Sequence, residues 1–128
     1  MASYQALIEA LSDLTHYLDR KYTAEIESRE LNQAYEDELK PLWTRSYYKV
    51  RKAADSGVFL FSKDVNEKLK EFIKLKDTEY HSYFEQLDEQ LFEAEKCLKV
   101  VVDSAQRELI RNDHWLSKLA IIFKPLPK

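Results

Sequence analysis

The sequence predicts an all-α protein, and three observations support this prediction. The chain has 128 residues but only one glycine and three prolines, which is too few for a sheet or a turn-rich fold. The stretch from Lys63 to Asn112 contains neither residue type. Within it, apolar side chains recur at alternating intervals of four and three residues, the spacing of a helix face that packs against a partner helix. These side chains are Tyr80, Phe84, Leu87, Leu91, Ala94, Leu98, Val101 and Ala105.

The composition predicts a cytoplasmic protein. Apolar residues make up 45% of the chain and charged residues 34%, which is typical of a foldable chain rather than a disordered one. The net charge of −3 does not favour nucleic acid, because the proteins that bind it usually carry a basic excess. Cys97 is the only cysteine, so no disulfide can form within the chain, as suits a reducing compartment.

The sequence shows no targeting or membrane signal. The N-terminal residues lack the basic region and apolar core of a signal peptide. No apolar run approaches the ~18–20 residues that cross a bilayer, so we expect no membrane partner. We expect one domain, in which residues 1–113 form a helical hairpin and residues 114–128 form a short amphipathic C-terminal helix and tail.

The first helical arm is expected from about Ser3 to Lys40. Its apolar stripe weakens between Glu25 and Gln33, where charged residues crowd together. Pro41 follows, and it removes a backbone donor from the helix. A helical stripe resumes immediately after it, so we favour a kink over a loop at this position. The residues of that stripe are Trp43, Tyr47, Val50 and Ala54.

The tip of the hairpin is expected near Phe59 and Leu60. Gly57, the only glycine, predicts a helix end with positive φ. Ser62 or Asp64 then caps the next helix, because either side chain can accept a hydrogen bond from an unpaired backbone N–H.

A polar run at residues 76–79 predicts a bend around Thr78. Pro41 and Thr78 lie at similar distances from the tip, so the two weak points would face each other in an antiparallel hairpin. The predicted fold is therefore a long antiparallel helical hairpin, coiled-coil-like and kinked near these two residues, with the short C-terminal helix added.

A single hairpin leaves more apolar surface than two helices can bury. Each such side chain left in water forgoes roughly 1.5–3 kcal/mol. We therefore expect a homodimer in which two hairpins complete a four-helix bundle. In the alternative, the tail and a folded-over tip cover this surface within one chain. The candidate interface residues are Phe59, Leu60, Phe61, Val100, Val102, Trp115, Leu119, Ile122 and Phe123.

The chain offers little that predicts catalysis, and we expect neither an enzyme nor a cofactor. Asp13 and His16 have a D-x-x-H spacing, but the Glu-x-x-His motif of di-metal bundles does not occur, so no metal is expected. Cys97 is interpreted as an interior or flanking residue. An acidic run on the second arm is interpreted as a solvated face, and it consists of Glu85, Asp88, Glu89 and Glu93.

Two basic stretches are the stronger candidates for binding. Residues 43–52 contain four cations and no acid, with Tyr48 among them, which suits phosphate contacts and base stacking. These cations are Arg45, Lys49, Arg51 and Lys52; in the alternative they are the solvated back of a helix. The tail, residues 114–128, has three lysines, no acid and a wide apolar face. It can pack on its own hairpin, dock on another protein or lie on a membrane surface.

These observations predict a helical protein-interaction or scaffold module that self-associates and binds a partner through the tip or the tail. The alternative is a nucleic-acid- or phosphate-binding regulator that uses residues 43–52. A third reading is a bundle enzyme with a metal near Asp13 and His16.

Overall fold

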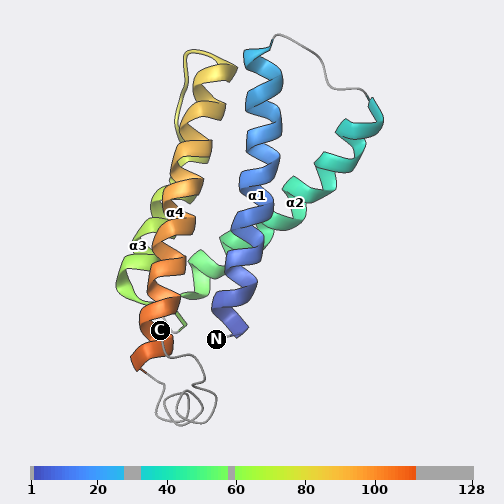
Figure 1. Ribbon diagram of the computed structural model, residues 1–128. Helices are drawn as coiled ribbons and strands as arrows, with labels where there is room; N and C mark the ends of the chain where they lie inside the picture. Colours follow the sequence, from blue (N-terminus) through green and yellow to red (C-terminus); the bar gives the residue numbers. More distant parts are fainter. Residues whose placement is uncertain (1, 28–32, 58–59, 112–128) are drawn as a thin grey trace, which may run out of the picture.

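The computed structural model describes residues 2–27, 33–57 and 60–111 (Figure 1). In these ranges the chain forms four α-helices and a short 3₁₀ helix, and it has no strand. The elements are α1 (Ala2–Ile26), α2 (Gln33–Ser56), α3 (Lys63–Lys74), η2 (Leu75–Asp77) and α4 (Tyr83–Arg111). The predicted all-α fold is therefore confirmed.

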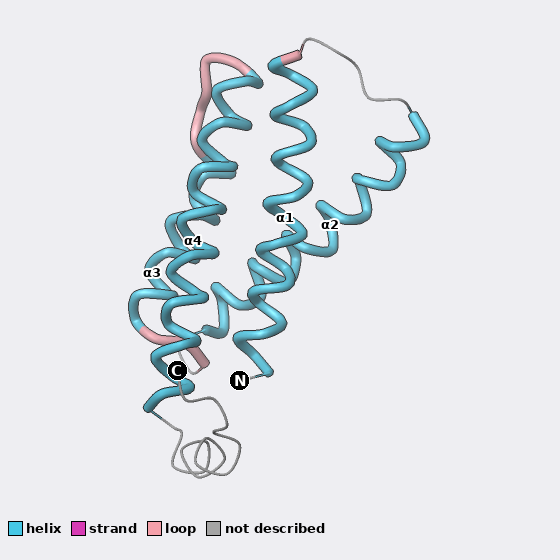
Figure 2. Tube along the Cα trace, viewed as in Figure 1, coloured by secondary structure: helices cyan, strands magenta, loops and turns pink. Residues whose placement is uncertain are grey.

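The helices run alternately up and down and form a bundle (Figure 1). Helix α4 lies antiparallel beside α1, and these two form the most extensive helix pair. Helix α2 packs against α1 and α3, and α3 packs against α4. Figure 2 shows the connection from α3 to α4 as a pink loop, which reaches the same end of the bundle as the last turn of α1.

The expected first arm, Ser3–Lys40, is not one helix. Helix α1 ends at Ile26 and α2 begins at Gln33, and α2 packs back against α1. The break falls where the apolar stripe weakens, and Ile26 itself is 55% exposed. Helices in proteins are stabilised mainly by the burial of an apolar face. A stretch that lacks such a face does not stabilise further helix, so α1 ends there.

Helix α2 continues past Pro41, as the stripe after the proline predicts. The proline is on the exposed side of the helix, where water can satisfy the carbonyl that loses its backbone donor. The kink at this position stays a prediction.

The stretch from Lys63 to Asn112 is not a single rod either. Helix α3 ends at Lys74, and α4 begins at Tyr83 and packs on α3. The polar run at residues 76–79 offers no apolar anchor, so the chain reverses there instead of bending. Ser82 then caps α4, because its Oγ accepts a hydrogen bond from the backbone N–H of Glu85 at 3.1 Å.

The tip shows one correct and one wrong prediction. Ser62 caps α3 as expected, and its Oγ accepts from the N–H of Val65 at 3.4 Å. Gly57 does not adopt the predicted positive φ. Gly57 is instead required by the lack of space for a side chain, because a Cβ there would lie 2.5 Å from Oδ1 of Asn66 and 3.0 Å from the Phe61 ring. Glycine therefore lets the end of α2 pack closely against the start of α3.

One chain supplies the whole core of this bundle. The fully buried side chains come from all four described helices and include Leu11, Leu14, Leu18, Val50, Val65, Leu69, Cys97 and Val101. The expectation that a second hairpin completes the bundle assumed two helical arms per chain. With four helices in the described residues, dimerisation is not needed to form the core and stays a separate prediction.

A cluster of hydrogen-bonded hydroxyl groups links α1, the N-cap of α3 and α4 at the end of the bundle where α1 begins. Ser104 Oγ lies 3.3 Å from Tyr4 Oη and 2.8 Å from Ser62 Oγ. The N–H of Ser62 donates to Tyr4 Oη at 3.2 Å, and the Tyr4 ring packs edge-on against Phe61. The buried hydroxyl of Ser104 is thereby satisfied, as buried polar groups in native structures usually are.

None of the described helices is both long enough and apolar enough to cross a membrane. The predicted C-terminal helix, within residues 114–128, lies outside the described residues.

Candidate functional site

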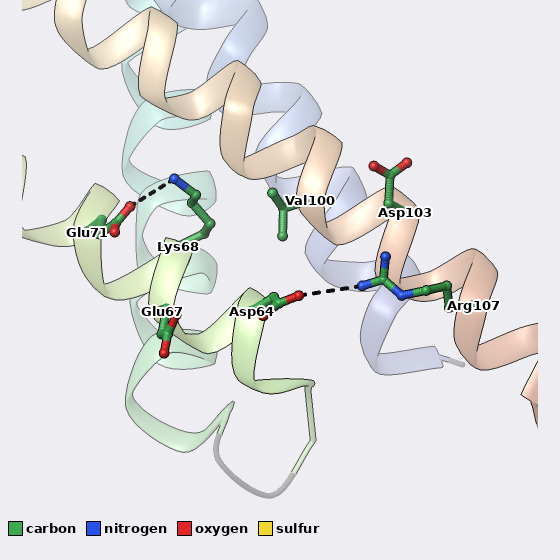
Figure 3. Close-up of a pocket in the computed structure, with 7 residues that line it drawn as sticks. All are labelled: Asp64, Glu67, Lys68, Glu71, Val100, Asp103 and Arg107. Carbon is green, nitrogen blue, oxygen red and sulfur yellow. Dashed lines mark hydrogen bonds and ion pairs between the residues drawn. The ribbon is translucent and has the colours of Figure 1, made fainter.

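Helices α3 and α4 enclose an open groove of about 300 Å³ (Figure 3). Helices α3 and α4 run antiparallel, and successive turns of each helix contribute the side chains that line the two sides of the groove. The lining residues are Asp64, Glu67, Lys68 and Glu71 from α3, and Val100, Asp103 and Arg107 from α4. Val100 is the one apolar residue among these seven, and it lies between the two helices (Figure 3).

Two ion pairs neutralise part of the charge in this groove. Arg107 Nη2 reaches across from α4 to Asp64 Oδ2 at 3.8 Å, and Lys68 Nζ lies 3.1 Å from Glu71 Oε2 on α3. The hydrogen bond to Glu71 raises the pKa of Lys68 above its usual value. Both pairs are solvent-exposed, so each contributes little to stability and can be rearranged by a ligand.

The groove carries more negative than positive charge. It has four carboxylates and two cations, which leaves an excess of two negative charges. Asp103 forms no ion pair within the described part of the chain, and Glu67 has only a 4.0 Å contact with Lys63 outside the groove. A cationic segment with an apolar side chain for Val100 is therefore the chemical complement of this surface.

Cys97 lies in the core rather than in the groove, as its interpretation as an interior residue requires. Its side chain is 1% exposed, and burial raises the pKa of its thiol to about 12. The positive charge of Lys68 opposes this rise in pKa, and the negative charges of Glu93 and Glu71 add to it. A thiol held in this form is a poor nucleophile.

The predicted interface residues are only partly brought together. Val100 and Val102 lie on different sides of α4, since residues two apart on a helix are separated by about 200°. Leu60 is 50% exposed near the start of α3, whereas Phe61 packs on Tyr4. The remaining candidates lie outside the described residues: Phe59, Trp115, Leu119, Ile122 and Phe123.

The basic face of α2 is fully accessible. Its four cations are exposed and form no ion pair with a described residue, and Tyr48 among them is 64% exposed. Val50 is buried, and Trp43 and Tyr47 pack against the core. Arg45, Lys49, Arg51 and Lys52 are thus exposed to solvent, and phosphate binding by them stays a prediction.

The other sequence candidates are surface residues. Asp13 and His16 are both exposed on α1. The acidic run on α4 is exposed at Glu85, Asp88 and Glu89 and partly buried at Glu93, which confirms its interpretation as a mostly solvated face. Within residues 2–27, 33–57 and 60–111, no cluster of three or more potential metal ligands is found.

Sequence reasoning missed the groove because it requires α3 and α4 to be neighbours. In one continuous helix from Lys63 to Asn112, Asp64 and Arg107 would lie far apart. In the structure they form an ion pair across the groove. The sequence feature that indicates this packing is the polar run at residues 76–79, which is compatible with a bend or with a full reversal of the chain.

Comparison of the chain with protein-family models, curated proteins and solved structures found no match.

Proposed function

We propose that this chain is a helical protein-interaction module that self-associates. In this proposal the groove between α3 and α4 of one chain receives residues 114–128 of a second copy. The observation that carries the proposal is the charge of the groove: four carboxylates and two cations surround an apolar residue, Val100.

The chemistry of residues 114–128 matches that of the groove. The segment contains three lysines and no acid, so it can supply the positive charge that the groove lacks. Trp115, Leu119 and Ile122 recur at helical spacing, which would place one apolar face against Val100. Recognition of an amphipathic helix in a groove between helices is a common mode of protein association.

A second copy is favoured because each chain carries both the groove and the basic segment. Mutual exchange forms the same contact twice around a two-fold axis, as is usual in homodimers. Once the first segment is bound, the second contact forms at a high effective concentration. A cytoplasmic location and the absence of a catalysed reaction are parts of the same proposal.

The proposal predicts that reversing charges in the groove weakens self-association. In the full chain, Glu67→Lys combined with Asp103→Lys should raise the dimer dissociation constant about tenfold or more, since each unfavourable charge acts on a lysine-rich segment. Sedimentation equilibrium measures this constant. Both residues are exposed, so the helices should remain folded, which circular dichroism can check.

The matched control is Glu89→Lys combined with Glu95→Lys, which changes the net charge by the same amount at two exposed acids of α4 outside the groove lining. It should leave the dimer constant nearly unchanged. Equal weakening by the control and by the groove variant would show that net charge, rather than the groove, governs association. A dimer that is unaffected by the groove variant would contradict the assignment of the groove.

A second candidate function is binding of single-stranded nucleic acid by the basic face of α2. The specific observation is that Arg45, Lys49 and Lys52 lie on one face of α2, beside the exposed ring of Tyr48. These cations are exposed and unpaired with described residues. Cations in this arrangement can contact phosphates while the ring stacks on a base.

This second candidate predicts measurable, salt-sensitive binding to an unstructured oligonucleotide at low salt. The triple variant Arg45→Glu, Lys49→Glu and Lys52→Glu should lose most of it, as measured by fluorescence anisotropy. The control replaces Lys70 and Lys74, exposed cations of α3, with glutamate. If the α2 variant retains the oligonucleotide as well as the control does, this function is excluded.

A further inference from the structure

A smaller cavity of about 150 Å³ lies among α2, α3, η2 and α4. It is lined by Trp43, Tyr47, Phe72, Lys76, Gln86 and Gln90. It shares no lining residue with the groove between α3 and α4, so it is independent of the function proposed above.

Aromatic rings form one side of this cavity. The rings of Trp43 and Tyr47, one turn apart on α2, are stacked with centroids 5.0 Å apart. The Phe72 ring lies 6.5 Å from that of Tyr47, and Tyr17 supports Trp43 from behind at 5.0 Å. Such rings favour the face or edge of another planar ring.

The polar groups of the cavity lack partners in the described part of the chain. The hydroxyl of Tyr47 is buried and forms no hydrogen bond there. Gln86 and Gln90 follow each other by one turn of α4, and neither side-chain amide has a hydrogen-bond partner among the described residues. The two amides line the cavity, so they are the unpaired polar groups that a ligand there can satisfy.

Lys76 is the one charged residue among the six that line the cavity, so the lining favours an anion. Lys76 Nζ lies 5.8 Å from the centroid of the Tyr47 ring and forms no ion pair with a described residue. Burial raises the pKa of the Tyr47 hydroxyl, Arg51 lowers it and Asp77 raises it. The hydroxyl therefore stays protonated at neutral pH, but its oxygen is buried in the wall of the cavity. The donors that a ligand can reach are the two amides and the ammonium group.

We propose that this cavity binds a single planar aromatic ring that carries a carboxylate, of which benzoate is the simplest member. An apolar cavity of about 150 Å³ is known to hold one benzene molecule, so the volume fits one ring and not two. The ring packs against the aromatic side chains. The carboxylate accepts hydrogen bonds from the ammonium of Lys76 and from neighbouring donors.

Calorimetric titration of the full chain with benzoate tests this inference. We expect a dissociation constant of about 1 mM or below, as befits a ligand of this size. Benzyl alcohol keeps the ring but lacks the charge, and cyclohexanecarboxylate keeps the charge but lacks the aromatic ring. Each should bind about tenfold more weakly, because each retains only one of the two recognised features.

Two variants locate the binding site. Lys76→Met should weaken benzoate binding about tenfold, since a charge-assisted hydrogen bond is lost. Gln90→Leu removes an amide donor that lines the cavity, so the affinity should fall several-fold. Lys99→Met, at an exposed lysine of α4 outside the cavity lining, is the control and should bind as the unmodified chain does.

Three results would overturn the inference. One is the absence of binding at about 10 mM benzoate. Another is equal affinity for cyclohexanecarboxylate, which would remove the role of the aromatic walls. The third is benzoate binding that neither Lys76→Met nor Gln90→Leu changes, which would place the ligand elsewhere.

Discussion

Cys97 will react with a disulfide reagent at pH 8 about a thousandfold more slowly in the folded chain than a free cysteine does. The thiolate is the reactive form, and burial raises the pKa of this thiol to about 12, so very little thiolate exists at that pH. The side chain is also only 1% exposed, which limits access. The rate of colour release from an aromatic disulfide measures this reactivity.

The same chain in denaturant is the control, because unfolding removes both protections and the rate should return to that of a free thiol. Rapid reaction of the folded chain would contradict the position of Cys97 in the core. Cys97 is the only cysteine, so the signal has one source.

The pKa of Cys97 also predicts how stability depends on pH. The folded-state pKa is raised, so its contribution to stability is fully present below about pH 8.5, the unfolded pKa of the thiol. Above that pH the unfolded thiol ionises and the folded one does not. The free energy of unfolding then falls by about 1.4 kcal/mol per pH unit, and the variant Cys97→Ala should lack this part of the decline.

Replacing Leu14 with alanine will lower the free energy of unfolding by about 3 kcal/mol. Leu14 is 0% exposed in the middle of α1, so truncation leaves a cavity among residues from the other helices. Urea denaturation followed by circular dichroism measures the change.

The matched control is Leu109→Ala, the same chemical change on α4 at a leucine that is 39% exposed. It should lower the free energy of unfolding by less than about 1 kcal/mol. Equal losses at the two leucines would mean that α1 does not form the centre of the bundle.

The sequence was sufficient to predict the all-α class and several local features of the helices. The apolar stripe of α1 follows from local spacing and agrees with the structure. For the cap of α3 and for Cys97 the sequence left two alternatives each, and the structure shows a cap at Ser62 and an interior thiol. Such features depend on residues within a few turns of each other, so a single sequence contains the necessary information.

The two chain reversals could not be predicted from the same local pattern. The weak stripe at 25–33 and the polar run at 76–79 are each compatible with a bend, a loop or a full reversal. The choice depends on which helices gain most by packing together. That gain involves contacts such as Tyr22 on Phe84 and Tyr4 near Ser104, which are remote in sequence.

The candidate sites depend directly on those reversals. Val100 was identified as an interface residue from the excess of apolar side chains around it. Its acidic neighbours on α3 were not identified, because they join it only after the chain turns back. The same is true of the aromatic cavity, where Trp43 and Phe72 belong to different helices.

Sedimentation equilibrium of the unmodified full chain tests the proposed self-association most directly. The account predicts twice the mass of one chain at tens of micromolar protein. It also predicts dissociation as salt is raised, because part of the attraction between the groove and the basic segment is electrostatic and therefore screened. A single-chain mass at every concentration, in low salt as well as high, would contradict it.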